Sequence, residues 1–264
     1  MTSTTGFIGV GQMGRPMVDR MLAAGIPLVF SSRRPEVVGE VTSAGGRALP
    51  TPAEVAAASE VLITCLFSDS QLREVLFDQG VLAAMRPGAV LVNHVTGSPT
   101  LAREVAAAAP AGVGFLDAPV SGTAESIRRG ELTVLVGGAD EDLEHARPSL
   151  STYASTILRV GDVGAAQVVK LLNNLLFTVH LGIAGEITRL GESMGAGRAG
   201  LVEALHHASG HSFALDQLAA RPFDELGQLA GPYLRKDIAS ARQAAAEFGV
   251  DLGQLGELAG WVDD

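Results

Sequence analysis

The sequence predicts an α/β protein with a doubly wound, mostly parallel sheet, followed by an all-α C-terminal domain. Over the first 160 residues, short apolar runs alternate with stretches of helical periodicity that often close on glycine, which is the pattern of βαβ units. From about Val163 onward strand-like runs disappear and helical periodicity continues to the C-terminus. We therefore expect two domains, residues 1–160 and residues 161–264.

Seven apolar runs are the candidate strands of the sheet. Their length, four to seven residues, suits buried strands better than helices. They lie at residues 6–10, 27–30, 61–67, 89–95, 113–119, 132–138 and 156–161. Helices are expected between most of them, for example at 12–24 and at 98–109, where Ser98 can cap the helix and Pro99 can start it.

A long helix over residues 165–194 is expected to lead from the sheet domain into the helical domain. Its predominantly apolar sequence contains Lys170, Asn173, Asn174 and His180, and burying such polar groups without hydrogen-bond partners is costly. These interruptions leave no unbroken apolar run of membrane-spanning length. Breaks between the later helices are expected at the glycine-containing stretch 195–197 and at glycines 210, 227, 231 and 249.

Composition and charge exclude several classes of function. The net charge of −10 over 264 residues argues against a nucleic-acid partner, which requires a basic face. The single cysteine, Cys65, cannot form an intrachain disulfide and favours a reducing compartment. The N-terminus lacks the pattern of a signal peptide. We expect a cytoplasmic protein with no membrane partner.

The first candidate strand leads directly into a glycine-rich turn and then a helix. The residues of the turn are Gly9, Val10, Gly11, Gln12, Met13 and Gly14. In this context G-x-G-x-x-G is the fingerprint of a Rossmann-type dinucleotide site, in which the glycines allow the tight turn, close approach of the pyrophosphate and helix–strand packing. The helix N-terminus adds N–H groups and the positive end of a dipole. A tight turn without a ligand is the alternative.

The end of the second strand indicates which dinucleotide binds. An NAD site usually has an acid there, but this chain has Ser31-Ser32-Arg33-Arg34, with no acid until Glu36. Guanidinium groups attract a 2′-phosphate that a carboxylate would repel. We therefore expect Ser32, Arg33 and Arg34 to contact the cofactor and NADP(H) to be preferred over NAD(H). The alternative is that both arginines belong to a solvated loop.

Several stretches together resemble the β-hydroxyacid dehydrogenase family, which includes 3-hydroxyisobutyrate dehydrogenases and tartronate semialdehyde reductases and is related to 6-phosphogluconate dehydrogenase. They are "GFIGVGQMGRPM" at the N-terminus, "DAPVSGTAESIRRGELTVLVGG" at 117–138, "GDVGAAQVVKLLNN" at 161–174 and "YLRKD" at 233–237. The combination covers most of the chain and is far more specific than any one motif.

The resemblance implies roles for the polar groups of the long helix. Lys170 would be the catalytic residue, and Asn174, four residues later on the same helix face, would hold the substrate and the lysine in register. A lysine in a cleft of low dielectric constant suits proton transfer to and from a carbonyl oxygen. The alternative is a lysine that extends along the helix edge to solvent.

The resemblance also assigns the loops. Ser121, Gly122 and Thr123 would hold the substrate carboxylate through N–H groups and a hydroxyl, Ser121 being counted with the catalytic residues, although "PVSGT" is also an ordinary turn sequence. Further cofactor contacts are expected at Leu66, Phe67, Gln71, Thr96 and Lys236, and for Lys236 a surface position is the main alternative.

This chain departs from the family pattern in several places. The usual D-x-S-T is Asn93-His94-Val95-Thr96, a proline is replaced by Phe67, and the second glycine of the substrate loop is Thr123. The sequence also stops earlier than a typical member, so a closing helix would be missing or supplied by a partner subunit. These changes put the usual substrates in doubt.

A metal site is not expected from the sequence. His206, His207 and His211 invite one, but Gly210 interrupts the helix, no H-E-x-x-H is present, and no carboxylate or cysteine is expected to complete a ligand set.

We therefore expect reversible oxidation of a small anionic β-hydroxy acid in a cleft between the two domains. Long apolar helix faces favour a homodimer or higher homo-oligomer. Two alternatives stay open: a reductase of an atypical carbonyl or imine substrate, and a non-catalytic NADPH-binding module that has no need of Lys170 or Asn174.

Overall fold

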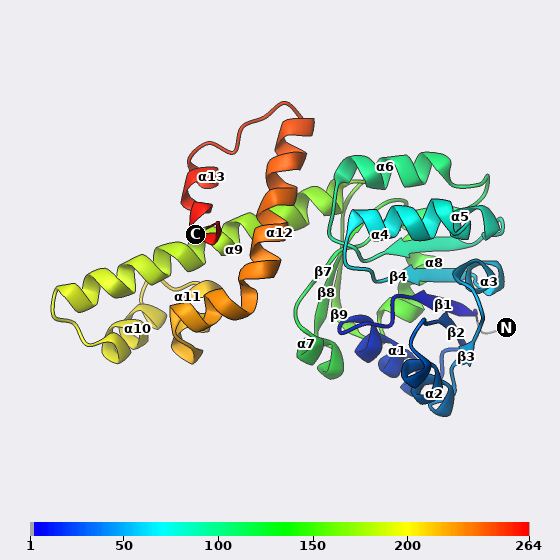
Figure 1. Ribbon diagram of the computed structural model, residues 1–264, viewed down its shortest axis with the longest axis horizontal. Coiled ribbons are helices and arrows are strands. Elements are labelled where there is room, and N and C mark those ends of the chain that lie inside the picture. Colours follow the sequence, from blue (N-terminus) through cyan, green and yellow to red (C-terminus); the bar gives the residue numbers. More distant parts are fainter. Residues whose placement is uncertain (1–2, 264) are drawn as a thin grey trace. The chain divides into compact units, whose positions relative to one another are not determined.

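The computed structural model describes residues 3–263 and consists of two compact units, Met1–Lys170 and Leu171–Asp264 (Figure 1). We call them the sheet unit and the helical unit. The division falls within one helix, α9 (Ala165–Ser193), and therefore later than the predicted boundary after residue 160.

The sheet unit is built on a nine-stranded sheet within the described residues. Its order is β3-β2-β1-β4-β5-β6-β8-β7, and β9 pairs with β8. The strands are β1 (Thr5–Ile8), β2 (Leu28–Ser31), β3 (Arg47–Ala48), β4 (Val61–Thr64), β5 (Val90–Asn93), β6 (Gly114–Asp117), β7 (Val120–Ser121), β8 (Leu132–Gly137) and β9 (Ala154–Gly161). The first six form parallel pairs, and β8 runs antiparallel to β6 and β7. All seven predicted runs overlap a strand, whereas the two-residue strands β3 and β7 were too short to predict.

Helices cover both faces of this sheet, which makes the predicted α/β class correct (Figure 1). The helices are α1 (Gly14–Ala23), α2 (Pro35–Ser43), α3 (Pro52–Ala58), α4 (Asp69–Arg73), the π-turn η1 (Glu74–Asp78), α5 (Val81–Ala84), α6 (Pro99–Ala108), α7 (Ala124–Arg129) and α8 (Asp140–Leu150). Alternate residues of each strand enter opposite cores. Phe7 of β1 belongs to the core that includes α1, α2, α7 and α8, and Ile8 belongs to the core that includes α3 to α6.

The helical unit contains no strand among the described residues after β9, as predicted. It consists of the greater part of α9 with α10 (Arg198–His206), α11 (Phe213–Ala220), α12 (Phe223–Glu247), α13 (Gln254–Leu258) and a 3-10 turn, η2 (Gly260–Val262). The predicted breaks at residues 227 and 231 are wrong, because α12 continues through both glycines and Pro232. Burial of Leu226, Leu234 and Ile238 in the core of the unit outweighs the helix propensity lost there.

By length and composition α9 could cross a membrane, a test that core helices also pass. The polar interruptions noted in the sequence do not prevent it from meeting that criterion. Leu175, Val179, Leu181 and Ala184 of α9 are buried in the core that α11 and α12 share with it. These contacts identify α9 as the central packing element of the helical unit.

Candidate active site

The glycine-rich turn after β1 has the geometry of a dinucleotide cradle. Gly9 has φ +100°, and a Cβ there would lie 2.2 Å from the carbonyl oxygen of Cys65. A Cβ on Gly14 would lie 2.2 Å from the Gly9 oxygen, so the helix approaches the strand closely. At Gly11, by contrast, a Cβ would meet only one atom, at 4.0 Å. The protein itself therefore does not require glycine at position 11, but close approach of a pyrophosphate would.

Helix α1 starts next to this turn without a side-chain cap on its N-terminus, where the N-cap residue is Met13. Strands β2 and β4 lie on either side of β1, so the chain reverses its winding direction here. Ligands of open α/β sheets bind outside the carboxyl ends of the strands at such a point, with phosphate at the helix N-terminus. Gln12 and Val10 belong to the same turn. The turn therefore fits the phosphates of a dinucleotide.

The two arginines after β2 differ in their surroundings. The Arg34 guanidinium donates to the carbonyl oxygen of Val10, and its backbone N–H donates to Ser32 Oγ at 3.2 Å. Arg33 is exposed and makes no hydrogen bond or ion pair with the residues that the structure describes. Arg34 thus links the ribose loop to the glycine turn, and Arg33 is the side chain that can turn toward a 2′-phosphate.

The loop after β4 contains the next group of predicted cofactor contacts. Phe67 is 58% exposed, and its backbone N–H donates to Gln71 Oε1 at 3.1 Å. Leu66 is half-buried and packs against the core below the loop. Since the Gln71 carbonyl is used to hold the loop, its amide nitrogen is the group left to face a ligand.

Thr96 lies in a loop that is held on both sides. Its neighbour Val95 accepts a hydrogen bond from Gln167 Nε2 at 2.9 Å, and the Gly97 N–H donates to Gln167 Oε1 at 2.9 Å. Asn93 Oδ1 accepts the Val95 N–H at 3.1 Å, so the asparagine of the altered family motif stabilises this loop. The half-buried Thr96 is presented between fixed backbone positions.

His94, another departure from the family pattern, is fully paired in the interior. Its Nδ1–H donates to the Ala118 carbonyl and its Nε2 accepts from the Tyr153 hydroxyl at 2.8 Å. Burial lowers the pKa of His94 to about 4, which keeps the ring neutral near pH 7. The histidine therefore ties the end of β5 to the segment that leads into the substrate loop.

The substrate loop itself is placed by β7 and α7. Ser121 pairs with Thr133 of β8. Gly122 has φ +137°, and a Cβ there would lie 2.9 Å from Leu132 Cδ1, so this position requires glycine. The Thr123 hydroxyl accepts the Ser126 N–H at 3.2 Å in a capping box for α7. The hydroxyl expected to face the substrate is thus engaged in helix capping.

Asp117, at the end of β6, fixes the start of α9. Its Oδ1 accepts the Gly164 N–H at 2.9 Å and its Oδ2 accepts the Gln167 N–H at 3.0 Å. Burial raises the pKa of Asp117 to about 6, while these backbone donors lower it, so the group is a carboxylate at pH 7. Lys170, one turn after Gln167, is only 8% exposed. Neither Asp117 nor Gln167 was predicted as a site residue, although both lie within the family motifs.

Asn174 is held within the helical unit. Its Nδ2 donates to Asp237 Oδ2 at 2.7 Å, and its Oδ1 accepts from Asn173 at 3.1 Å. Lys236 Nζ lies 3.6 Å from Asp237 Oδ1. The lysine–aspartate pair near the end of the chain therefore orients Asn174 through the aspartate. This role of Asp237 was not predicted from the sequence.

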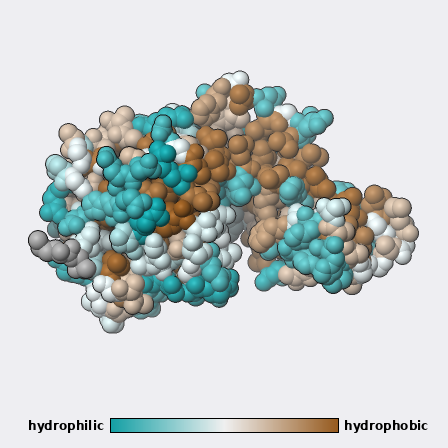
Figure 2. Space-filling model, turned by 180° about the vertical axis from the view of Figure 1, so that it is seen from behind, coloured by the Kyte–Doolittle hydropathy of each residue, from teal (hydrophilic) through white to brown (hydrophobic). Residues whose placement is uncertain are grey.

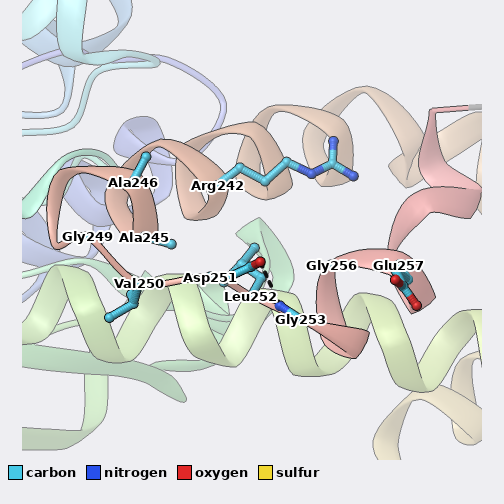
Figure 3. Close-up of a pocket in the computed structure, with 10 residues that line it drawn as sticks. All are labelled: Arg242, Ala245, Ala246, Gly249, Val250, Asp251, Leu252, Gly253, Gly256 and Glu257. Carbon is cyan, nitrogen blue, oxygen red and sulfur yellow. Dashed lines mark hydrogen bonds between the residues drawn. The ribbon is translucent and has the colours of Figure 1, made fainter.

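A hollow of about 680 Å³ lies elsewhere in the helical unit, between the end of α12 and α13 (Figure 3). It contains none of the predicted site residues. Arg242 at its edge is paired with Asp263 at 2.9 Å, and Asp251 accepts the Gly253 N–H at 2.9 Å across the turn (Figure 3). Two of its charged groups, Arg242 and Asp251, are thus already used within the fold.

Two family models match the chain. Residues 4–161 match the NAD-binding domain of 6-phosphogluconate dehydrogenase, and residues 164–261 match the "NAD-binding of NADP-dependent 3-hydroxyisobutyrate dehydrogenase". The 2-(hydroxymethyl)glutarate dehydrogenase of Eubacterium barkeri is 33% identical over 253 residues, 94% of this chain and 84% of that protein. The chain belongs to the β-hydroxyacid dehydrogenase family.

Two other members of the family are also close. The NAD-dependent L-serine dehydrogenase of Pseudomonas aeruginosa is 33% identical over 250 residues, which are 90% of this chain and 84% of that protein. The structure of Mycobacterium tuberculosis 3-hydroxyisobutyrate dehydrogenase with L-serine superposes with a TM-score of 0.90 at 29% identity, covering 100% of this chain and 93% of that one.

Family membership confirms the predicted relationship and the predicted nicotinamide cofactor. Both matched models describe NAD-binding regions, and the cradle around Gly9, Gly11 and Gly14 fits such a dinucleotide. The relatives are dehydrogenases of hydroxy acids. The protein is therefore an NAD(P)-dependent oxidoreductase of the hydroxy acid class.

Proposed function

We propose that this member of the family prefers NADP(H) and interconverts a small β-hydroxy acid with its carbonyl form, with Lys170 as proton donor and acceptor. One observation carries the proposal. Lys170 lies one turn after the point where Asp117 and Gln167 fix α9 to the loops after β6 and β5. These loops lead to Ser121 and Thr96, so the lysine has a defined position relative to the expected substrate and ribose contacts.

When bound, the nicotinamide supplies or accepts hydride at the substrate carbon. Lys170 would act at the oxygen: its ammonium donates a proton to the carbonyl oxygen in reduction, and its amine takes the hydroxyl proton in oxidation. Asn174 lies on the next turn of the same helix face. Because Asp237 uses only one amide hydrogen of Asn174, the second can orient the substrate oxygen.

The substrate carboxylate would be bound by the turn that follows β7. Gly122 adopts a conformation that only glycine tolerates well, and the Ser121 hydroxyl lies directly before it. With the Thr123 hydroxyl engaged in capping, the anion would be held by the Ser121 side chain and by backbone N–H groups of the turn.

The preference for NADP(H) rests on Arg33. No acid occupies the end of β2, and the exposed Arg33 is unpaired among the described residues, so its guanidinium can bind a 2′-phosphate with two hydrogen bonds. Arg34 would contribute through the shape of the loop, since it is held by the Val10 carbonyl.

The protein would act as a homodimer or higher homo-oligomer. One side of α9 has an exposed stripe of apolar residues that follow one another at intervals of three, four or seven positions. Figure 2 shows brown, hydrophobic areas on the surface of the helical unit. The stripe consists of Val169, Leu172, Leu176, Ile183, Ile187 and Leu190 of the helix, together with Met194 directly after its last residue. A face of this kind marks an interface between proteins. The single cysteine supports a cytoplasmic location.

The test is reduced-nicotinamide absorbance on a panel of small β-hydroxy acids with NADP⁺ and NAD⁺ in parallel. Lys170→Met should lower kcat by about 10²- to 10⁴-fold, while Arg86→Met, which removes an exposed positive charge from the segment after α5, should leave kcat nearly unchanged. Arg33→Ser should raise KM for NADP⁺ at least tenfold and leave NAD⁺ kinetics nearly unchanged, with the exposed Arg86→Ser as control.

Tight NADPH binding with no turnover of any acid would contradict the β-hydroxy acid proposal. A Lys170→Met variant with wild-type kcat would remove the lysine from the chemistry. Equal effects of Arg33→Ser on both cofactors would end the 2′-phosphate assignment.

A further inference from the structure

Three ligand-type side chains that are not among the predicted site residues converge on the surface of the helical unit. His206 is the last residue of α10, His211 lies in the following turn and Asp216 is in α11. His206 Nδ1 lies 2.7 Å from Asp216 Oδ1, and His211 Nε2 lies 3.0 Å from the same oxygen. One potential ligand atom from each residue lies within 4.8 Å of the other two.

The prediction that no carboxylate completes a ligand set with these histidines is wrong. Asp216 lies five positions after His211, in the next helix, and joins them only through the fold. The turn between α10 and α11 folds back, so that α11 places Asp216 against both imidazoles. The ligand set of two histidines and one carboxylate is therefore present in space.

The directions of the hydrogen bonds suit a metal ion. One nitrogen of each ring lies at hydrogen-bond distance from the Asp216 carboxylate, and such a nitrogen becomes a metal ligand when it carries no proton. The two rings are nearly perpendicular, at 88°, with centroids 5.0 Å apart, which keeps them from blocking each other. His206, His211 and Asp216 are all partly exposed, with side-chain exposures of 43%, 46% and 33%, so small rotations can bring their ligand atoms to the distances of a coordination sphere.

We propose that His206, His211 and Asp216 bind a divalent transition-metal ion that accepts imidazole and carboxylate ligands, with Zn²⁺ as the representative case. Two imidazoles and one carboxylate are a common zinc ligand set, completed by water in an open fourth position. Ca²⁺ and Mg²⁺ are disfavoured because they select oxygen ligands. The ion would connect the end of α10 to the first turn of α11.

A neighbouring pair offers the main competing site. His207 Nε2 lies 3.1 Å from Glu203 Oε1 on α10, and the His207 ring is perpendicular to that of His206 at 4.9 Å. This pair supplies one imidazole and one carboxylate only, so it should bind more weakly than the set of three ligands.

The experiment is calorimetric titration of Zn²⁺ into the full chain after removal of metals with EDTA, at pH 7.5 in two buffers of different ionisation enthalpy. We expect one ion per chain and a buffer-dependent enthalpy, because metal binding displaces protons. His211→Gln and Asp216→Asn should each weaken binding at least about tenfold. His145→Gln, which removes an exposed histidine from α8 of the sheet unit, should change nothing, and His207→Gln should have less than a threefold effect.

Absence of saturable binding would overturn the proposal. So would binding that survives both His211→Gln and Asp216→Asn, or that is lost in His207→Gln alone, which would assign the ion to the Glu203 pair. Circular dichroism in EDTA checks that each variant is folded, and His206→Gln provides a second removal of a ligand if one of the others fails that check.

Discussion

The sheet unit and the helical unit differ in how their interior polar groups are paired and in how many large apolar side chains they leave exposed. In the sheet unit the interior polar groups are paired mainly with backbone: Asp117 and Gln167 hold the start of α9, and His94 holds Ala118. In the helical unit the buried hydroxyls of Thr178 and Thr188 donate to backbone of their own helix, α9, and large apolar side chains remain exposed. Of the large hydrophobic residues exposed in the described chain, all but Phe67, Leu158 and Val169 belong to the helical unit.

The difference shows which unit buries its large apolar side chains within its own fold. A doubly covered sheet buries the apolar residues of both faces and satisfies its interior polar groups within one unit. A small set of helices built around α9 cannot enclose every side of that helix. The sheet unit thus provides fixed positions for the cofactor loops, while the helical unit leaves the apolar stripe of α9 exposed, which is the observation behind the proposed homo-oligomer.

The largest expected effect is loss of self-association when charges are placed on the exposed apolar stripe of α9. Ile183→Glu combined with Leu190→Glu places two charges on it, and desolvating unpaired charges costs several kcal/mol. Light scattering after size exclusion should therefore give half the wild-type mass or less. Ser193→Glu adds one negative charge at an exposed position of the same helix that is not part of the stripe, and it should keep the wild-type mass. Unchanged association of the double variant would place the interface elsewhere.

The sheet unit should be most sensitive at Asp117. In Asp117→Ala the N–H groups of Gly164 and Gln167 lose their acceptor in the interior, which we expect to cost about 3–5 kcal/mol of unfolding free energy. Chemical denaturation followed by fluorescence measures it. The exposed Asp78→Ala should cost less than about 0.5 kcal/mol. Equal losses for the two variants would mean that the helix start does not depend on Asp117.

His94 should make the stability of the sheet unit depend on pH. Since its pKa is about 4 in the folded protein and 6.5 ordinarily, the unfolded chain binds the proton first as pH falls. Stability should drop between pH 6.5 and 4, by up to about 3 kcal/mol.

The raised pKa of Asp117 acts in the opposite direction between pH 6 and 3.8. The test is therefore the difference in pH dependence between wild type and His94→Phe, in which the contribution of Asp117 cancels. Identical slopes in denaturation experiments would show that His94 titrates normally in the fold.

The smallest expected effect concerns the cap of α7. Thr123→Ala removes the acceptor of the Ser126 N–H and should cost about 1 kcal/mol, a shift of roughly 2–4 °C in Tm. Thr42→Ala, at an exposed position inside α2, should not lower Tm. A Thr123→Ala protein with unchanged Tm but altered KM for substrate would instead assign the hydroxyl to the substrate.

The extent to which the sequence predicted the structure differs between local and distant features. The strands, the glycine turn and α9 were predictable because each depends on periodicity or on one tight turn. The continuity of α12 through two glycines and Pro232 was not, since burial of Leu226, Leu234 and Ile238 exceeds the local propensity cost. Nor was the contact of Asp216 with His206, which depends on how two short helices fold back on each other.

The sequence by itself determined the α/β class, the dinucleotide turn and the family, because these depend on short-range patterns and on motifs of fixed spacing. The tertiary structure decided which polar residues hold the site together. Asp117, Gln167 and Asp237 were not assigned until the fold showed that their partners lie 47, 70 and 63 positions away. Hydrogen bonds between residues so far apart in sequence leave no local pattern, since only the packing of strands and helices brings their atoms within reach.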